Sequence, residues 1–407
     1  MIYRFLKTWL LPIVALIAVG IALVTYESDY LFKVQELNLF LYSKMFFEQQ
    51  MVVSGGLLTW LGTYFTQYFY YPALGTTLLC LWLGLMMWLF KHAFRIADRY
   101  SALLLVPLAL VVITDVDLGY WIYYLKLRGH FFIAPMGFSW AFAMVWAYRV
   151  LPTKWWMRTI WLPISVALSY PFVGIYSLIA ALTMAVMALV ANKSIGRKVI
   201  DAIVAMLSLV AVPLVYYRTI FVQTNISNIW YTALPLFRTD VNHMAYYTPW
   251  IAMTALMLIL ALTIRIEVAE KPRKPLLFWA SQVALVALVA VGTWHFWYKD
   301  KNFHHEIVMY HCIDNKDWEG VLMEYRDMDA DEEPTRMMWM MKNLALTRLG
   351  RAGDEMFRYK NGDAHSDAPF EVRLTQIGGK QIYYNYGKIN FCYRWCLEDG
   401  VEYGWRV

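Results

Sequence analysis

Charged residues are scarce in this chain, and their scarcity argues against a soluble fold. Asp, Glu, Lys and Arg make up 16% of the 407 residues, whereas hydrophobic residues make up 60%. A water-soluble fold of this size could not hide that much apolar surface, so we expect lipid to surround most of the chain. Intrinsic disorder and fibrous architectures are excluded for the same reason.

Several motifs that mark enzyme classes are also missing. The chain has no Gly-rich phosphate loop, no zinc-knuckle spacing and no Ser/His/Asp order, which argues against an enzyme that uses nucleotides. We expect no nucleic-acid partner either, although the net charge is +6. Residues 299–407 hold 15 Lys and Arg against 19 Asp and Glu, whereas the first 298 hold 21 against 11. The basic excess therefore belongs to the apolar part, and two compartments are implied.

Apolar runs separated by short charged clusters are abundant, and they predict an all-α polytopic bundle of about nine membrane-spanning helices. A perpendicular span needs roughly 20 residues, so the shorter runs should extend into their aromatic flanks. The stretch from 160 to 190 is too long for one span, and Tyr170–Gly174, which contains Pro171, is its natural break. The expected spans are Trp9–Tyr26, Ala73–Phe90, Ala102–Thr114, Phe131–Tyr148, Ile160–Tyr170, Gly174–Val190, Val199–Tyr217, Trp250–Ile264 and Leu276–Trp294.

The loops between these runs predict their orientation. Alternate loops hold 15 Lys and Arg on one side and 6 on the other, and the richer side is expected to face the cytoplasm. The amino terminus belongs to the richer side and is therefore expected inside. No small-residue cleavage site follows the first run, because Val24–Glu27 is bulky, so we expect this run to be retained as a helix rather than removed as a signal peptide. An odd number of spans places the tail outside. We expect a transmembrane domain over residues 1–298 and an extracytoplasmic domain over residues 299–407.

The first outer loop, residues 27–72, is too long for a turn. Apolar residues recur in it at helical spacing, which predicts helices that lie flat in the membrane interface. Such helices would either brace the bundle or form part of a site.

Two acidic motifs emerge on this outer face and are candidates for catalysis. Glu27 and Asp29 follow the first span, and Asp115 and Asp117 follow the third. Carboxylates at a water–lipid boundary can act as a general base or share a divalent cation. Acids near helix ends are also common in purely structural roles.

This order of features resembles the GT-C class of glycosyltransferases. The resemblance covers about the first 220 residues and implies that a sugar passes from a polyprenyl-phosphate carrier to an acceptor on the non-cytoplasmic side. It implies that Glu27 or Asp29 is the base and that Asp115 or Asp117 assists it, with a divalent cation as a conceivable cofactor. Outer-face cations would then meet the lipid phosphate: Lys126, Arg128, Arg218 and Arg238.

A second likeness covers nearly the whole chain. The segments Ser54–Leu58, Thr66–Pro72, Asn343–Leu346 and Leu349–Arg351 resemble an uncharacterised family of Gram-negative bacterial multipass membrane proteins. This resemblance implies a bacterial inner-membrane location and a periplasmic tail, but no particular chemistry.

The tail reads as ordinary soluble sequence with helices at about Asp317–Met328, Pro334–Leu349, Asp354–Tyr359 and Ile389–Glu398. Its pattern loosely resembles a tetratricopeptide helix pair. Stacked helix pairs usually end in a polar cap, so we expect residues 1–407 to belong to a longer array, or the last helix to pack on the membrane domain. His304 and His311 would share a helix face, but no further metal ligands are specified, and Cys312 could pair with Cys392 or Cys396.

Two functions follow from the sequence. One is a membrane enzyme that uses a lipid-linked sugar and the outer acids. The other is a membrane-anchored scaffold that uses its helical tail to bind an envelope protein.

Overall fold

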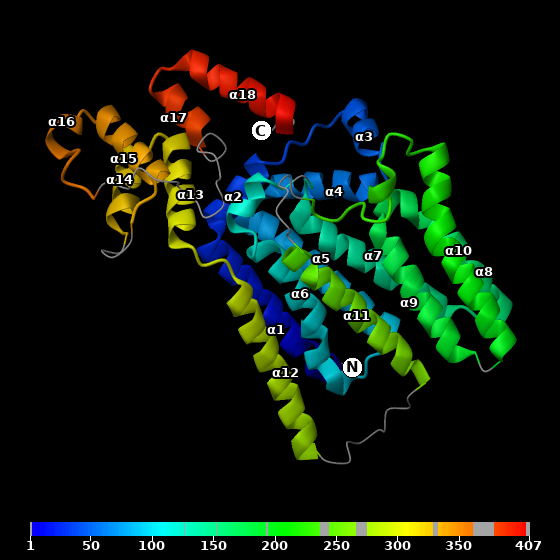
Figure 1. Ribbon diagram of the computed structural model, residues 1–407. Coiled ribbons are helices and arrows are strands. Elements are labelled where there is room, and N and C mark those ends of the chain that lie inside the picture. Colours follow the sequence, from blue (N-terminus) through cyan, green and yellow to red (C-terminus); the bar gives the residue numbers. More distant parts are fainter. Residues whose placement is uncertain are drawn as a thin grey trace. The chain divides into compact units, whose positions relative to one another are not determined.

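The computed structural model describes residues 2–125, 127–152, 154–192, 194–236, 244–265, 275–328, 333–360 and 378–403. Across these residues the structure is helical and contains no β-strand (Figure 1), as the all-α prediction requires. The chain forms two compact units. We call Met1–Tyr26, Phe40–Asp117 and Leu127–Trp297 the membrane unit, and Glu27–Leu39, Leu118–Lys126 and Tyr298–Val407 the tail unit.

The nine expected spans all lie on helices of the membrane unit, to within about one turn. In the described residues, seven helices are long and apolar enough to cross a membrane. The short α9 is apolar but has 17 residues, and α8, which carries Arg158 near its start, is not one of the seven. The count of nine is therefore not confirmed. The helices are α1 (Ile2–Tyr26), α5 (Pro72–Phe94), α6 (Leu105–Val116), α7 (His130–Val150), α8 (Trp155–Val173), α9 (Ile175–Ala191), α10 (Ile195–Thr219), α11 (Thr248–Leu262) and α12 (Pro275–Phe296).

The expected break inside residues 160–190 is confirmed, but it lies at the end of the segment that we named. Pro171 sits inside α8, and the chain turns at Gly174, whose φ is +56°. A Cβ atom there would lie 2.7 Å from the Oγ1 atom of Thr232, so both the backbone conformation and the space require glycine.

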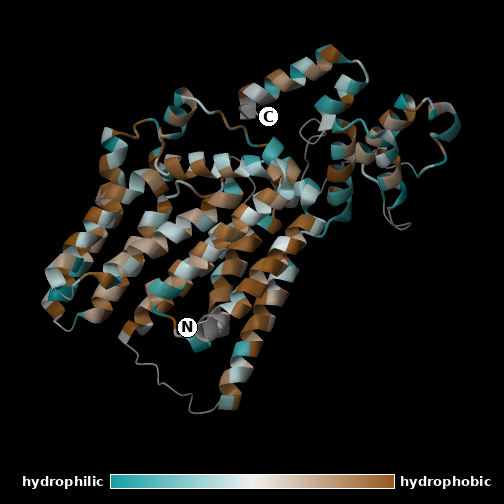
Figure 2. Ribbon diagram, turned by 180° about the vertical axis from the view of Figure 1, so that it is seen from behind, coloured by the Kyte–Doolittle hydropathy of each residue, from teal (hydrophilic) through white to brown (hydrophobic). Residues whose placement is uncertain are grey.

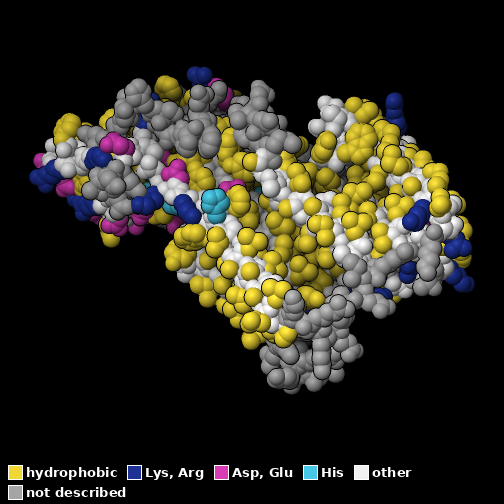
Figure 3. All heavy atoms as spheres, turned by 60° about the horizontal axis from the view of Figure 1, so that its bottom comes forward, with side chains coloured by type: hydrophobic (Ala, Val, Ile, Leu, Met, Phe, Trp, Pro, Cys, Tyr) yellow, Lys and Arg dark blue, Asp and Glu magenta, His cyan; other side chains and the backbone are white. Residues whose placement is uncertain are grey.

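The centre of the membrane unit holds large aromatic side chains, and its outside is also apolar. Phe90, Phe138 and Phe142 are fully buried where α5 and α7 pack together. In contrast, α12 leaves large apolar side chains exposed, among them Leu276 and Leu288. Figure 2 shows hydrophobic residues along most helices of this unit, and Figure 3 shows hydrophobic side chains over most of its visible surface. An exposed apolar surface of this extent indicates contact with lipid.

The long first loop is divided between the units. Its helices α3 (Lys44–Gln50) and α4 (Gly56–Thr66) belong to the membrane unit, where α4 crosses one end of the bundle and packs on α7 and α8 (Figure 1). Helix α2 (Ser28–Glu36) belongs to the tail unit. The domain boundary expected near residue 298 assigned α2 to the transmembrane domain, together with the short turn η3 (Gly119–Tyr123). The structure groups both with the tail unit.

Helices of the tail unit follow the sequence signals at most positions. Its elements are α13 (Lys301–Asp314), α14 (Trp318–Arg326), α15 (Arg336–Arg348), α16 (Ala352–Glu355), α17 (Lys380–Asn385) and α18 (Ile389–Tyr403). Asp317 caps α14 by accepting a hydrogen bond from the Gly320 amide (2.9 Å), as its position before the amphipathic run predicts. In place of the helix expected at Asp354–Tyr359, the structure has the four-residue α16, which begins earlier and ends at Glu355. The tetratricopeptide resemblance remains a prediction.

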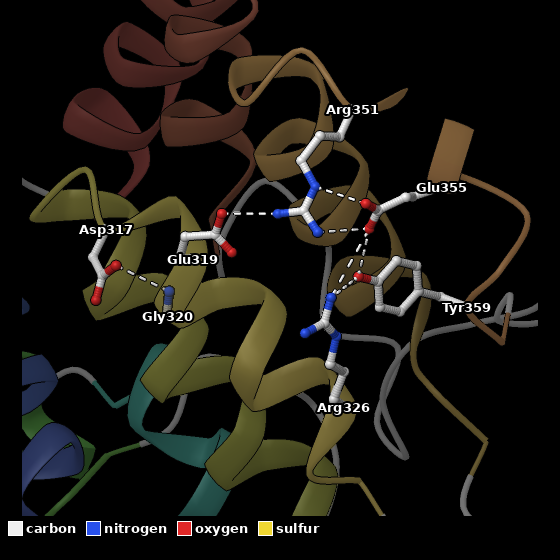
Figure 4. A network of polar contacts seen from close by, with 7 residues as sticks. All are labelled: Asp317, Glu319, Gly320, Arg326, Arg351, Glu355 and Tyr359. Carbon is white, nitrogen blue, oxygen red and sulfur yellow. Dashed lines mark hydrogen bonds and ion pairs between the residues drawn. The ribbon is translucent and has the colours of Figure 1, made fainter. Parts of the chain in front are cut away.

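Arg351 holds the short helix α16 against α14. Its guanidinium lies 2.8 Å from Glu319 and 2.7 Å from Glu355, while Arg326 donates to the Tyr359 hydroxyl at 2.5 Å (Figure 4). This network ties the chain after Gly350 to side chains of α14.

Candidate functional site

The four candidate acids do not share one compact unit. Asp115 and Asp117 lie in the membrane unit, and Glu27 and Asp29 lie in the tail unit. Each pair therefore has surroundings of its own.

Asp115 lies in the interior of the membrane unit, in the last turn of α6. Its side chain is 4% exposed, and its Oδ1 atom lies 3.6 Å from the Nε2 atom of His130, the first residue of α7. The same His130 atom lies 2.9 Å from the Thr114 carbonyl oxygen, and the Thr114 hydroxyl donates to Asp115 at 3.3 Å. Asp115 is thus well placed to orient His130 but not to meet water or a large substrate.

Asp117 is the more accessible acid of this pair. It follows the last residue of α6 and is partly exposed. Burial raises the pKa of the Asp117 carboxyl to about 6. A carboxylate with a pKa near the working pH is an effective general base, because it is ionised before the reaction and still holds a proton afterwards. Its charge also acts on the hydroxyl of Tyr246, at the start of the α11 region.

A groove of about 670 Å³ opens in the membrane unit between α9, α11 and the segment after α10. Apolar side chains make up most of its wall, and a few polar groups join them, which is the usual composition of a site for a hydrophobic ligand. Its wall includes Ile179, Asn228, Tyr231, Tyr247, Trp250 and Thr254.

Trp250 connects the groove wall with the acids. Its ring lies 6.1 Å from the ring of His130, and its Nε1 atom donates to the Tyr176 hydroxyl at 3.1 Å. Tyr247, another wall residue, adjoins Tyr246 in the chain and donates to the Pro235 carbonyl oxygen at 2.7 Å. The groove therefore lies at the same end of the bundle as Asp115 and Asp117.

The Ser54–Leu58 segment fixes part of this wall. Ser54 and Thr232 are joined by their hydroxyls at 2.6 Å, and the Gly55 amide donates to the Pro171 carbonyl oxygen at 2.9 Å. Gly55 has a φ of +81°, and a Cβ atom on it would lie 2.9 Å from that of Ala233. Glycines at this junction let three chain segments meet, which holds residues 228–236 at the edge of the groove.

Both acids of the tail unit face histidines of α13. Glu27 is buried, and its Oε2 atom lies 3.7 Å from the Nδ1 atom of His304. Asp29 forms a hydrogen bond with His311, whose ring stacks on Phe32 at 4.5 Å between centroids. That hydrogen bond is the main reason that the pKa of His311 is raised. These pairs attach α2 to α13 within the tail unit.

His304 and His311, which would share a helix face, have no additional metal ligands in the described residues, where no cluster of three or more His, Cys, Asp or Glu could hold an ion. All four cysteines, which lie in described segments, are free. The suggested pairing of Cys312 with Cys392 or Cys396 is therefore absent from the structure.

The sequence analysis missed a buried lysine. Lys33 on α2 is 4% exposed, and its Nζ atom lies 3.0 Å from Glu36 and 3.3 Å from the centre of the Tyr310 ring. The Tyr310 hydroxyl donates to Glu36 at 2.7 Å. Burial lowers the pKa of Lys33, although Glu36 opposes the change. A signal was present, since Lys33 lies between Leu31 and Val34 on an apolar face, but nothing in the sequence indicated that α13 would cover it.

The proposed phosphate-binding cations are only partly described. Lys126 and Arg238 lie outside the described residues. Arg128 precedes α7, and Arg218 is exposed in the last turn of α10, with its guanidinium 5.9 Å from the Tyr217 ring. Neither Arg128 nor Arg218 is a wall residue of the groove, so their role stays a prediction.

Apolar helices of spanning length, together with a polar helical tail unit, define a polytopic α-helical membrane protein. The chain belongs to the family of unknown function DUF6057, which matches residues 3–404. No curated protein and no solved structure matches it. The resemblance to an uncharacterised family of membrane proteins is thus confirmed in this general form.

Proposed function

We propose that this protein is an integral-membrane glycosyltransferase of the bacterial inner membrane that uses a polyprenyl-phosphate-linked sugar. The groove at the acid-bearing end of the membrane unit is the observation that carries the proposal. Its size suits an isoprenoid chain, and its few polar groups, including Asn228 and Tyr231, suit the polar end of a lipid. The amino terminus would face the cytoplasm and the tail unit the periplasm.

The reaction places Asp117 in the role of base. Asp117 takes the proton of an acceptor hydroxyl, and the freed oxygen forms a bond to the anomeric carbon of the sugar. The bond between that carbon and the phosphate oxygen breaks, and its electron pair leaves with the polyprenyl phosphate. Asp115 is a positioning residue, which orients the His130 ring beside Trp250 at the groove wall. The acid of the first loop, Glu27 or Asp29, is the alternative base that the GT-C resemblance implies.

Filling the groove tests this proposal. Thr254 lines the groove on α11, so Thr254→Trp should reduce transfer at least tenfold by excluding the lipid. Leu262→Trp is the control, because Leu262 is 58% exposed near the end of the same helix and is not a wall residue. Transfer is followed by mass spectrometry of envelope glycans in cells that depend on the variant. Equal transfer by both folded variants would overturn the proposal.

A membrane-anchored scaffold is the second candidate, and the acid–histidine pairs of the tail unit favour it. Glu27 and Asp29 are both engaged in holding α2 against α13, a role that requires no catalysis. A scaffold would bind an envelope protein through exposed tail residues such as Tyr393, which is 68% exposed on α18. Replacing that surface would then be damaging, whereas the groove variant would be harmless.

A further inference from the structure

Three arginines line one pocket at the other end of the membrane unit. This pocket, which we call the arginine pocket, has a volume of about 290 Å³ and is walled by Arg95, Tyr148, Arg149 and Arg158 with a few apolar residues. Arg95 follows the last residue of α5, Arg149 lies in the last turn of α7, and Arg158 lies near the start of α8. Helix α6 begins near the end of α5, where the pocket lies, and runs to Asp117 at the end that holds the groove. The pocket and the groove are therefore at opposite ends of the bundle.

No acid neutralises these arginines in the described part of the chain. None of the three forms an ion pair there, and no Asp or Glu is a wall residue. The nearby carboxylate of Asp201 instead accepts hydrogen bonds from Thr159 and Asn192. Arg95 and Arg158 both repel Arg149. Like charges around one pocket destabilise the empty site, so an anion that entered it would relieve the repulsion.

At least one of the N–H donors of these guanidinium groups has no hydrogen-bond partner among the described residues. Arg149 donates to the Ala93 carbonyl oxygen at 2.9 Å and Arg158 to that of Leu151 at 3.3 Å. However, the Nε atom of Arg158 is buried without a hydrogen-bond partner among the described residues. A buried donor that is left unpaired is unfavourable. The general preference for basic residues at one end of membrane helices explains charges in loops, but not a buried donor without a partner on a residue that lines a pocket.

The conformation of Arg95 follows from the way α5 ends. Arg95 has a φ of +52°, in the left-handed region that favours glycine. The Ile96 amide donates to the Lys91 carbonyl oxygen at 3.0 Å, as is usual where a helix ends in a left-handed residue. A glycine would end α5 with less strain, and the chain instead places a guanidinium at the pocket.

We propose that the arginine pocket binds a phosphate group. Planar guanidinium groups bind two phosphate oxygens at once, and three of them line this pocket. The phosphate could belong to the headgroup of an anionic lipid or to a free phosphate, since both present the same oxygens. The site is independent of the groove and of the glycosyltransferase proposal.

To test the site, the melting temperature of the full-length protein in detergent is measured with and without inorganic phosphate at constant ionic strength. To test the lipid source, the same measurement is made in nanodiscs with and without phosphatidylglycerol. Wild-type protein should show a phosphate- or phosphatidylglycerol-dependent rise in melting temperature. The double variant Arg95→Gln, Arg158→Gln should bind at least tenfold more weakly. Arg197→Gln is the control, because Arg197 is exposed on α10 beside Trp155 and outside the pocket.

The outcomes separate the sources. Stabilisation by inorganic phosphate in detergent assigns a free phosphate, whereas stabilisation only by phosphatidylglycerol assigns a headgroup. If the double variant does not fold, Arg95→Gly replaces it in the binding measurement. This variant removes the charge and the left-handed conformation of a non-glycine residue together, so it should be as stable as wild type and bind phosphate several-fold more weakly. Unchanged binding in the pocket variants, or an equal loss in Arg197→Gln, would overturn the site.

Discussion

Replacing Asp117 by Asn should reduce sugar transfer by about 100- to 10,000-fold, the usual contribution of a general base. Asn keeps the size of the side chain but cannot take a proton from the acceptor. Because burial raises the pKa of the Asp117 carboxyl to about 6, wild-type transfer should also fall as the pH drops below about 6, where the base becomes protonated. The measurement is the rate of transfer from a polyprenyl-phosphate sugar in membranes, across a series of pH values.

Asp98→Asn is the matched control for this variant. Asp98 precedes α6 at the opposite end, where it forms an ion pair with Lys91 at 2.5 Å. Its loss should leave transfer within about twofold. Single Ala variants of Glu27, Asp29 and Asp115 complete the set, since the GT-C resemblance gives the first-loop acids the same role. Normal envelope glycans with all four of these acid variants, each tested singly, would end the enzyme proposal.

Replacing Lys33 by Met should destabilise the tail unit by about 3 kcal/mol, because removing one partner of a buried ion pair leaves the other partner without compensation. Met fills nearly the same volume, so the loss reports mainly the charge of Glu36 that remains beside Tyr310. Pulse proteolysis of the full-length protein in urea measures the change, with cleavage read in the tail. The double variant Lys33→Met, Glu36→Gln should recover part of the loss.

Arg394→Met provides the comparison within the tail unit. Arg394 and Glu398 also form an ion pair, at 2.7 Å, but both side chains are largely exposed, and such pairs add at most about 1 kcal/mol. A loss in Lys33→Met no larger than in Arg394→Met would show that the buried lysine is not needed to hold α2 on α13.

The sequence predicted those features that depend on short stretches of chain. Apolar runs located the membrane helices, Pro171 and Gly174 marked the break between α8 and α9, and Asp317 marked the start of α14. These signals are local, because hydrophobicity, backbone conformation and capping act over a few residues.

Features that depend on distant contacts were not predicted. The Asp29–His311 pair joins residues 282 positions apart, and nothing near Asp29 indicates a histidine. In the same way, the burial of Lys33 depends on Tyr310, and the arginine pocket depends on three helix ends that meet only in the folded bundle. The sequence identified Asp115 and Asp117 as a pair, but it could not show that one is buried beside His130 and the other partly open.

The side of the membrane that the groove faces tests the account most directly. Gly196 lies in the first turn of α10, and Ser227 lies in the short turn η4 (Ile226–Asn228) that follows the other end of this helix; both are exposed. Ser227 adjoins the groove residue Asn228. In a variant whose four native cysteines are replaced, a membrane-impermeant maleimide should label Ser227→Cys in intact cells and should reach Gly196→Cys only after the inner membrane is opened. Labelling of Gly196→Cys but not Ser227→Cys in intact cells would place the groove and Asp117 in the cytoplasm and contradict the proposed reaction at the outer face.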